Sequence, residues 1–268
     1  MATNGHFSED SPLLPKTDNN SKFWTQIKHH LTADVNRKWA DLPLIMVYFS
    51  TGLIDSSSIS TWSSFVSMQT GNTVYLGLGI AEPEASKRYL KALTSIGFFC
   101  LGAMCFGAFH RWGSPLRRWV FVSSFLFQAV CVVAAIIPVM LDIIDKESLR
   151  WPNIMSLAFL SFQAAGSAIG SRQLQYNELP TVVLTSVYCD LMSDPLLFTA
   201  SLKEDPKRNR RALAIVVCLC GAICGGLFAR SSAGLAGALW TSVAIKVFIA
   251  VVWLFWSPVR PVELGGQD

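Results

Sequence analysis

The chain has 268 residues, and only 15% of them are charged, whereas about 25% are charged in soluble globular domains. Its hydrophobic fraction is 51% and its formal net charge is +4. The charges collect at the N-terminus and in short loops, with long uncharged runs between them. This pattern excludes an ordinary soluble domain, and it places the basic residues beside anionic lipid rather than nucleic acid.

Residues 1–41 form a polar tail without the apolar stretch that a secretory signal needs. Within it, Glu9–Leu14 has the spacing of an acidic dileucine sorting signal, so we expect the plasma membrane or a vacuolar or endosomal membrane. Between Ser21 and Leu42, apolar residues recur mostly at helical spacing, which predicts an amphipathic helix on the membrane surface. A frayed polar leader is the alternative.

Six segments approach the ~20 residues that a helix needs to cross a bilayer core. They are a segment from Leu42 that becomes polar after Ile54, then Ala92–Phe109, Trp119–Leu141, Trp151–Ser171, Ala212–Ala229 and Leu235–Trp256. None alternates apolar and polar residues as barrel strands do. The sequence therefore predicts an all-α, polytopic membrane bundle over residues 42–256, followed by a short tail over 257–268.

Two further segments, Trp62–Ile80 and Pro180–Ala200, are interrupted by polar residues and predict broken or re-entrant helices. If both are re-entrant the chain has six spans, and if both cross it has eight. Six spans place 15 Lys and Arg residues on the side of the N-terminus and 6 on the other, and eight spans place 16 and 5. Both arrangements put the two termini in the cytoplasm. The polarity of the two segments favours six.

An internal repeat relates the two halves of this domain, over about residues 42–141 and 151–256. Gly102–Phe109 aligns with Gly221–Phe228 with five identities in eight positions, and each block follows a charged loop. The two broken segments precede these loops at corresponding places. Paired interruptions of this kind are a sequence indicator of the binding site in a transporter.

Three ionisable residues lie in the apolar domain: Asp55, Asp190 and Lys246. A charge at such a depth costs about 2.5–3.5 kcal/mol on insertion scales and usually has a partner or a wet neighbour. We therefore expect Lys246 to pair with Asp55 or Asp190, and protonation or substrate binding at this pair would gate transport. In the alternative, Asp55 lies at a helix end and Lys246 reaches the membrane surface.

The motif Gln69-Thr70-Gly71-Asn72 favours a helix start, where Thr70 or Asn72 could cap free amides and the helix N-terminus could bind an anionic group. Gly71 would let substrate approach the backbone. For Asn72, a hydrogen bond to a neighbouring helix is an equal alternative to substrate contact. Thr185 lies in the corresponding segment of the second half. The predicted substrate-binding residues are Asp55, Gln69, Thr70, Gly71, Asn72, Thr185, Asp190 and Lys246.

The run Gly52-Leu53-Ile54-Asp55, followed by Phe65, Gln69–Asn72 and Leu76–Leu78, resembles the YoaK-like family of membrane proteins, also called domain of unknown function 1275, and points to a fungal-type or other eukaryotic member. In the second half, Gly170–Gln173 lacks the Gln-Asn pair that the family tends to show. The resemblance implies a multi-span protein and bears more on the fold than on the function.

The seven cysteines lie in apolar segments and the four histidines lie outside them, so no metal, cofactor or disulfide is predicted. No catalytic motif is present, which argues against an enzyme. The favoured function is a transporter or channel for an unknown small molecule. Whether its transport is coupled to protons is left open by the sequence. A non-transporting scaffold or accessory subunit is the alternative. The expected partners are membrane lipid, the small-molecule substrate and, as an open alternative, a second copy of the chain.

Overall fold

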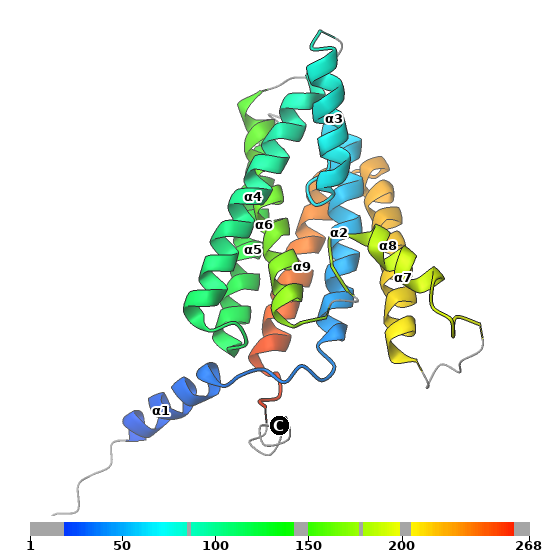
Figure 1. Ribbon diagram of the computed structural model, residues 1–268. Helices are drawn as coiled ribbons and strands as arrows, with labels where there is room; N and C mark the ends of the chain where they lie inside the picture. Colours follow the sequence, from blue (N-terminus) through cyan, green and yellow to red (C-terminus); the bar gives the residue numbers. More distant parts are fainter. Residues whose placement is uncertain (1–18, 85–86, 142–149, 177–178, 199–204, 260–268) are drawn as a thin grey trace, which may run out of the picture.

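The computed structural model describes residues 19–84, 87–141, 150–176, 179–198 and 205–259 (Figure 1). These ranges form nine α-helices. They are α1 (Asn19–Thr32), α2 (Asp41–Trp62), α3 (Gln69–Ala81), α4 (Arg88–Gly113), α5 (Arg118–Met140), α6 (Trp151–Gln173), α7 (Leu184–Met192), α8 (Pro206–Arg230) and α9 (Gly234–Leu254).

Six of these helices, α2, α4, α5, α6, α8 and α9, are long and apolar enough to cross a membrane, which confirms the predicted spans. Apolar side chains cover the outside of the bundle, for example Leu219 and Ile223 on α8, which are 59% and 53% exposed. Polar side chains such as Gln128 and Ser161 are fully buried instead. A soluble protein rarely exposes so much contiguous apolar surface, so this distribution matches a lipid surround.

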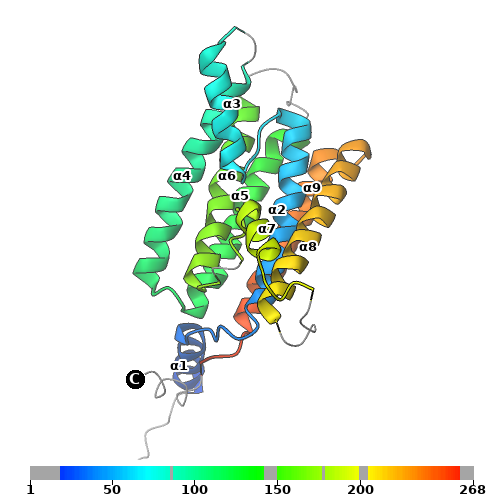
Figure 2. The same ribbon diagram turned by 45° about the vertical axis from the view of Figure 1, so that its right-hand side comes forward.

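The helices α3 and α7 are too short to cross. Their 13 and 9 residues give lengths of about 20 and 14 Å, against a hydrocarbon core of about 30 Å. Figures 1 and 2 show that α3 starts beside the middle of α2 and runs to the upper end of the bundle, whereas α7 starts beside α2 and runs toward the lower end. The two interruptions are therefore re-entrant in shape and open to opposite ends, so the structure supports six spans and not eight.

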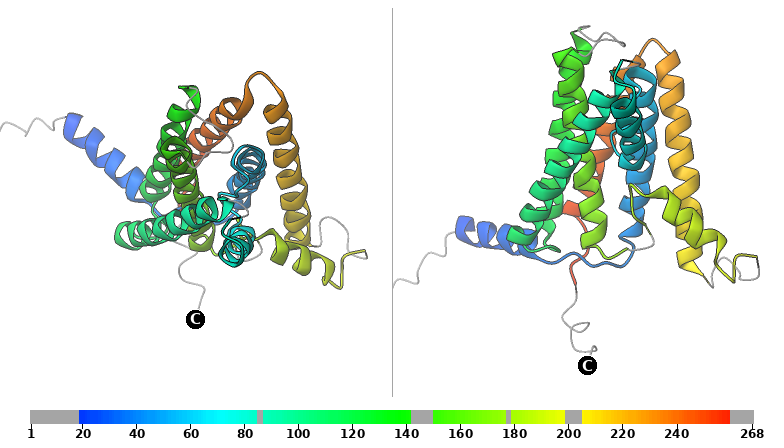
Figure 3. Two further views of the ribbon diagram at one scale, coloured as in Figure 1. Left: turned by 90° about the horizontal axis from the view of Figure 1, so that it is seen from above. Right: turned by 45° about the horizontal axis from the view of Figure 1, so that its top comes forward.

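The spanning helices form two groups that are visible from above (Figure 3), with α4 and α5 beside α6, and α8 and α9 beside α2. The most extensive packing is between α2 and α8, between α4 and α6, and between α5 and α9. The α5–α9 contact joins the groups.

Glycines allow the closest of these contacts. A Cβ added at Gly52 of α2 would lie 2.9 Å from the backbone nitrogen of Ala222 in α8. One added at Gly102 of α4 would lie 3.1 Å from the carbonyl carbon of Phe162 in α6. Backbones of membrane helices approach each other at such small residues, so these glycines set the spacing of both groups.

The described ends of the chain meet at the lower end of the bundle in Figure 1. Asn36 N donates to Ser257 O at 3.0 Å, and Val259 N donates to Asp34 O at 3.0 Å. The buried Arg118 at the start of α5 donates to the carbonyl oxygens of His30 and Trp256, which ties α1 to this end. The predicted sorting signal Glu9–Leu14 lies outside the described residues.

Candidate functional site

The chain after α2 folds back along α2 and is held there by Asp55. The Asp55 carboxylate accepts hydrogen bonds from Val66 N at 2.9 Å and Ser67 N at 3.0 Å, and also from the Ser67 hydroxyl. Asp55 lies seven residues before the end of α2, so the loop descends about 10 Å along α2 at 1.5 Å per residue. The loop tip that precedes α3 is thus fastened inside the bundle by a carboxylate of its own chain.

Asn72 fastens the other side of this loop. Its side chain is fully buried, and it accepts from Phe65 N at 3.0 Å and donates to Phe65 O at 2.8 Å. It also donates to Ser95 Oγ of α4 at 2.9 Å and to Gln69 Oε1 at 3.0 Å. These bonds use both ends of the amide, and the one to Ser95 is the predicted hydrogen bond to a neighbouring helix, so Asn72 positions the loop.

The predicted cap at the start of α3 is wrong. Met68 occupies the N-cap position and its side chain makes no cap hydrogen bond. The amides of Val66 and Ser67, just ahead of the helix, bond to Asp55 instead of to a free anion. Beside Gly71 the space is filled by Met68 and Phe65, whose side chains would lie 2.8 and 2.9 Å from an added Cβ. The absence of a side chain at Gly71 therefore leaves room for Met68 and Phe65.

Both re-entrant segments and two spanning helices line one cavity of about 420 Å³. A cavity of this size suits a small molecule. Its described lining comes from α2, from the loop and start of α3, from residues 181–185 and from α8; its polar members are Tyr48, Thr51, Asp55, Ser56, Ser67, Thr70, Thr181 and Thr185. The predicted site residues Asp55, Thr70 and Thr185 are thus brought together, although they are far apart in sequence.

Lys246 does not pair with Asp55 or Asp190, and the predicted ion pair is wrong. Its side chain is 2% exposed, and Nζ donates to Gln128 Oε1 at 2.8 Å and Ser167 Oγ at 3.2 Å. No carboxylate of the described residues lies within 4.0 Å of it. The lysine therefore joins α9 to α5 and α6 through neutral acceptors, and it does not extend to the membrane surface.

Lys246 is nevertheless next to the cavity. A small void of about 10 Å³ lies between Lys246 and the wall that Thr51 and Ser67 form, and both of these residues also line the larger cavity. Only the side chains of the shared wall, such as Thr51 and Ser67, therefore separate Lys246 from the cavity that Asp55 lines.

Asp190 lies outside the cavity. It is exposed near the end of α7, whose buried residues Val187 and Leu191 face the bundle instead. The sequence places Asp190 in the apolar domain, but α7 is a single short helix, so the carboxylate on its outer face is exposed. The predicted buried charge at this position is wrong.

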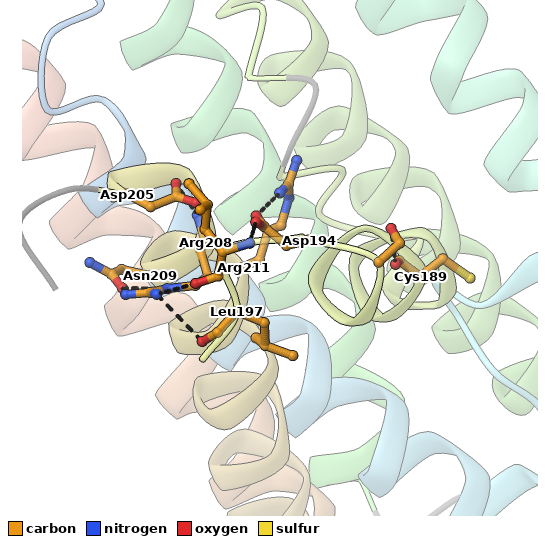
Figure 4. A network of polar contacts seen from close by, with 9 residues as sticks. Cys189, Asp194, Leu197, Asp205, Arg208, Asn209 and Arg211 are labelled. Atoms are coloured by element: carbon orange, nitrogen blue, oxygen red, sulfur yellow. Dashed lines mark hydrogen bonds and ion pairs between the residues drawn. The ribbon is translucent and has the colours of Figure 1, made fainter. Parts of the chain in front are cut away.

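The end of the α7 segment is joined to α8 by a polar network (Figure 4). Arg208 is 6% exposed and donates to Leu196 O at 2.9 Å, and Arg211 Nη1 lies 3.5 Å from Asp194 Oδ2. Asp205 caps α8 by accepting from Arg208 N at 3.0 Å, and this hydrogen bond holds the pKa of Asp205 below its usual value. The network anchors the second re-entrant segment at the lower end of the bundle.

Sequence reasoning missed Tyr48, Thr181, Gln128 and Ser167. Gln128 is an uncharged polar residue inside an otherwise apolar span, which is a usable signal for a buried polar contact. Tyr48 and Thr181 carry no such signal, because their position beside the cavity depends on how α2 and the second re-entrant segment pack.

These features define the class of protein: a multi-pass helical membrane protein with six candidate spans and two re-entrant segments that meet at a cavity containing Asp55. Residues 44–252 match the family described as "Protein of unknown function (DUF1275)". The chain belongs to this family, as its first-half motif indicates. Searches of curated proteins and of solved structures returned no significant match.

Proposed function

We propose that this protein is a transporter that moves a small molecule through the cavity between its two re-entrant segments, and that it has no enzymatic activity. The observation that carries the proposal is the cavity of about 420 Å³ whose wall includes Asp55 and both segments. Non-helical backbone at membrane depth is tolerated where it lines a cavity, and transporters bind substrates at such broken helices.

The packing of the helices supports an internal repeat that relates α2, α4 and α5 to α6, α8 and α9. Exchange of the two halves would convert the α2–α8 contact into the α6–α4 contact and would leave α5–α9 unchanged, and these are the most extensive contacts of the bundle. The aligned glycines agree, because Gly102 packs on the backbone of α6 and Gly221 on the backbone of α2.

The α5–α9 contact adds a second correspondence. Ser124 and Gln128 of α5 have the same four-residue spacing as Ser242 and Lys246 of α9, and Lys246 bonds to Gln128. An axis relating the halves would pass close to this pair. Inverted halves of this kind allow one half to rock against the other, which would open the cavity to each side in turn.

The orientation that we propose puts the lower end of Figure 1 in the cytoplasm, because most described basic residues outside the spans lie near α1, the α4–α5 connection and the start of α8 at that end. The helix α1 would then lie on the inner membrane surface, with Phe23 and Trp24, which are 55% and 65% exposed, facing lipid. Single cysteines at Ser257 and Ser232, in a chain without the native cysteines, would test this. We expect an impermeant thiol reagent added outside cells to label Ser232→Cys only.

The transport proposal is tested in sealed vesicles that contain the purified protein, with labelled amines, neutral metabolites and organic acids, with and without a proton gradient. A matched pair of variants on α3 locates the path. Thr70→Trp would fill the cavity and should abolish uptake, whereas Thr73→Trp, one turn further on and outside the lining, should leave uptake intact. If no solute moves or binds, the protein is a scaffold instead.

A further inference from the structure

The cavity contains one carboxylate and no positive charge among its described lining residues. Asp55 accepts two backbone amides at Oδ1 and the Ser67 hydroxyl at Oδ2. A carboxylate offers about four acceptor sites, so Oδ2 keeps a free one. Within the described residues, no Lys, Arg or His nitrogen lies within 4.0 Å of Asp55.

Two buried hydroxyl groups at this cavity also have no hydrogen-bond partner among the described residues. Tyr48 and Thr181 are each 1% exposed, both line the cavity, and neither the Tyr48 hydroxyl nor Thr181 Oγ1 makes a hydrogen bond. Buried polar groups nearly always have a partner, and each unpaired one carries an uncompensated cost of desolvation. A bound molecule that hydrogen-bonds to these groups would remove this cost.

The rest of the wall suits a short apolar body. Its apolar members include Ile59, Phe65, Met68 and Val183. The face of an aromatic ring such as Phe65 attracts a cation, and this attraction is greatest when the cation is desolvated. An inorganic ion would leave most of a cavity of about 420 Å³ and its apolar wall without contacts.

We infer that the cavity binds a small organic amine in its ammonium form, with the ammonium at Asp55 and a hydroxyl or similar polar group at Tyr48 and Thr181. This inference rests on the proposed transport function, because it names the class of substrate for the same cavity. An organic acid is disfavoured, since its carboxylate would face Asp55 and find no cation in the described wall.

Three probes distinguish a cationic, a neutral and an anionic ligand: aminobutanol, butanediol and hydroxybutanoate. They share the same four-carbon chain with a hydroxyl at one end and differ in the group at the other end. Binding to the purified full-length protein is measured by titration calorimetry. We expect aminobutanol to bind at least about tenfold more tightly than butanediol, because a hydrogen bond to a charged group contributes about 1.5–3 kcal/mol. Hydroxybutanoate should not bind.

Variants of the cavity residues test which side-chain groups contact the ligand. Asp55→Asn should weaken aminobutanol binding about tenfold or more, while Asp190→Asn, which removes an exposed carboxylate outside the cavity, should not change it. Tyr48→Phe and Thr181→Val each remove one hydroxyl and should weaken binding about three- to tenfold. These two variants keep the test valid if Asp55→Asn does not fold, because neither hydroxyl bonds to another part of the described chain.

The inference is overturned if aminobutanol binds no better than butanediol, if hydroxybutanoate binds best, if sodium ions compete as well as the amine, or if none of the cavity variants changes the affinity. Vesicle uptake separates this result from the transport proposal. Binding of the amine without uptake would retain the ligand class and reject transport, and uptake of an acid alone would retain transport and reject the amine.

Discussion

The contact between α2 and α8 can be tested at a single glycine. A Cβ added at Gly221 would lie 2.9 Å from the carbonyl carbon of Phe49 and 3.1 Å from the backbone nitrogen of Leu53, and closer still to the oxygen of Phe49. The optimal separation of non-bonded carbon atoms is about 3.5–4.0 Å, so the helices would have to move apart by at least about 0.6 Å. The obstacle is backbone, which cannot rotate away as a side chain could.

Overpacking of this kind costs about 1–3 kcal/mol. For a chain of this size each kcal/mol lowers the melting temperature, Tm, by about 2–4 °C, so Gly221→Ala should lower it by roughly 2–12 °C. Gly226→Ala is the matched control, because an added Cβ there would have no heavy atom within 4 Å. Its Tm should be equal or slightly higher, since Ala favours a helix over Gly.

The assay is thermal unfolding of both variants in the same detergent, followed by ligand binding. Gly52, Cys218 and Ala222 line the cavity from the same helix pair, so separation of α2 and α8 should also weaken binding in Gly221→Ala. Equal Tm values for the two variants would refute the close approach of the helices and the cavity geometry that depends on it.

Two further predictions concern buried polar residues. Asn72→Leu leaves Phe65 N without its partner and should cost about 1–3 kcal/mol, lowering Tm and speeding hydrogen exchange in the loop, whereas Thr73→Val, which loses one bond within its own helix, should not. Loss of uptake with unchanged Tm and exchange would show instead that Asn72 contacts substrate. Lys246→Met and Asp55→Asn should have effects on stability that add within about 0.5 kcal/mol, since the two residues are not paired. A coupling energy well above that value in the double variant would show that Lys246 and Asp55 interact directly, as predicted from the sequence.

The transmembrane plan was predictable because it depends on local composition. A run of about 20 apolar residues can form a span wherever its neighbours lie, and five of the six candidate spans coincide with such runs. The exception is α2, whose second half is polar. The two interruptions were recognisable for the same reason, because Ser, Thr, Asn and Asp at that density cannot face lipid. The Gln69–Asn72 motif identified the loop as special, although its residues brace the loop more than they line the cavity.

The sequence by itself therefore determined the class of fold and the presence of two broken segments, and it favoured six spans over eight. The short lengths of α3 and α7 in the structure then decided for six. Only the tertiary structure decided which polar groups meet, because the rotation and register of the packed helices select each partner, and Gln128 and Lys246 are 118 residues apart in the chain. Lys246 finds Gln128 rather than a carboxylate, and Asp55 is held by amides of the next loop. Asp190 faces outward because a helix of nine residues cannot bury both of its faces. The low charge content of the sequence indicated a membrane protein. The packing of α2, α8 and the two re-entrant segments then placed Asp55 in the cavity as its one charged residue among the described lining.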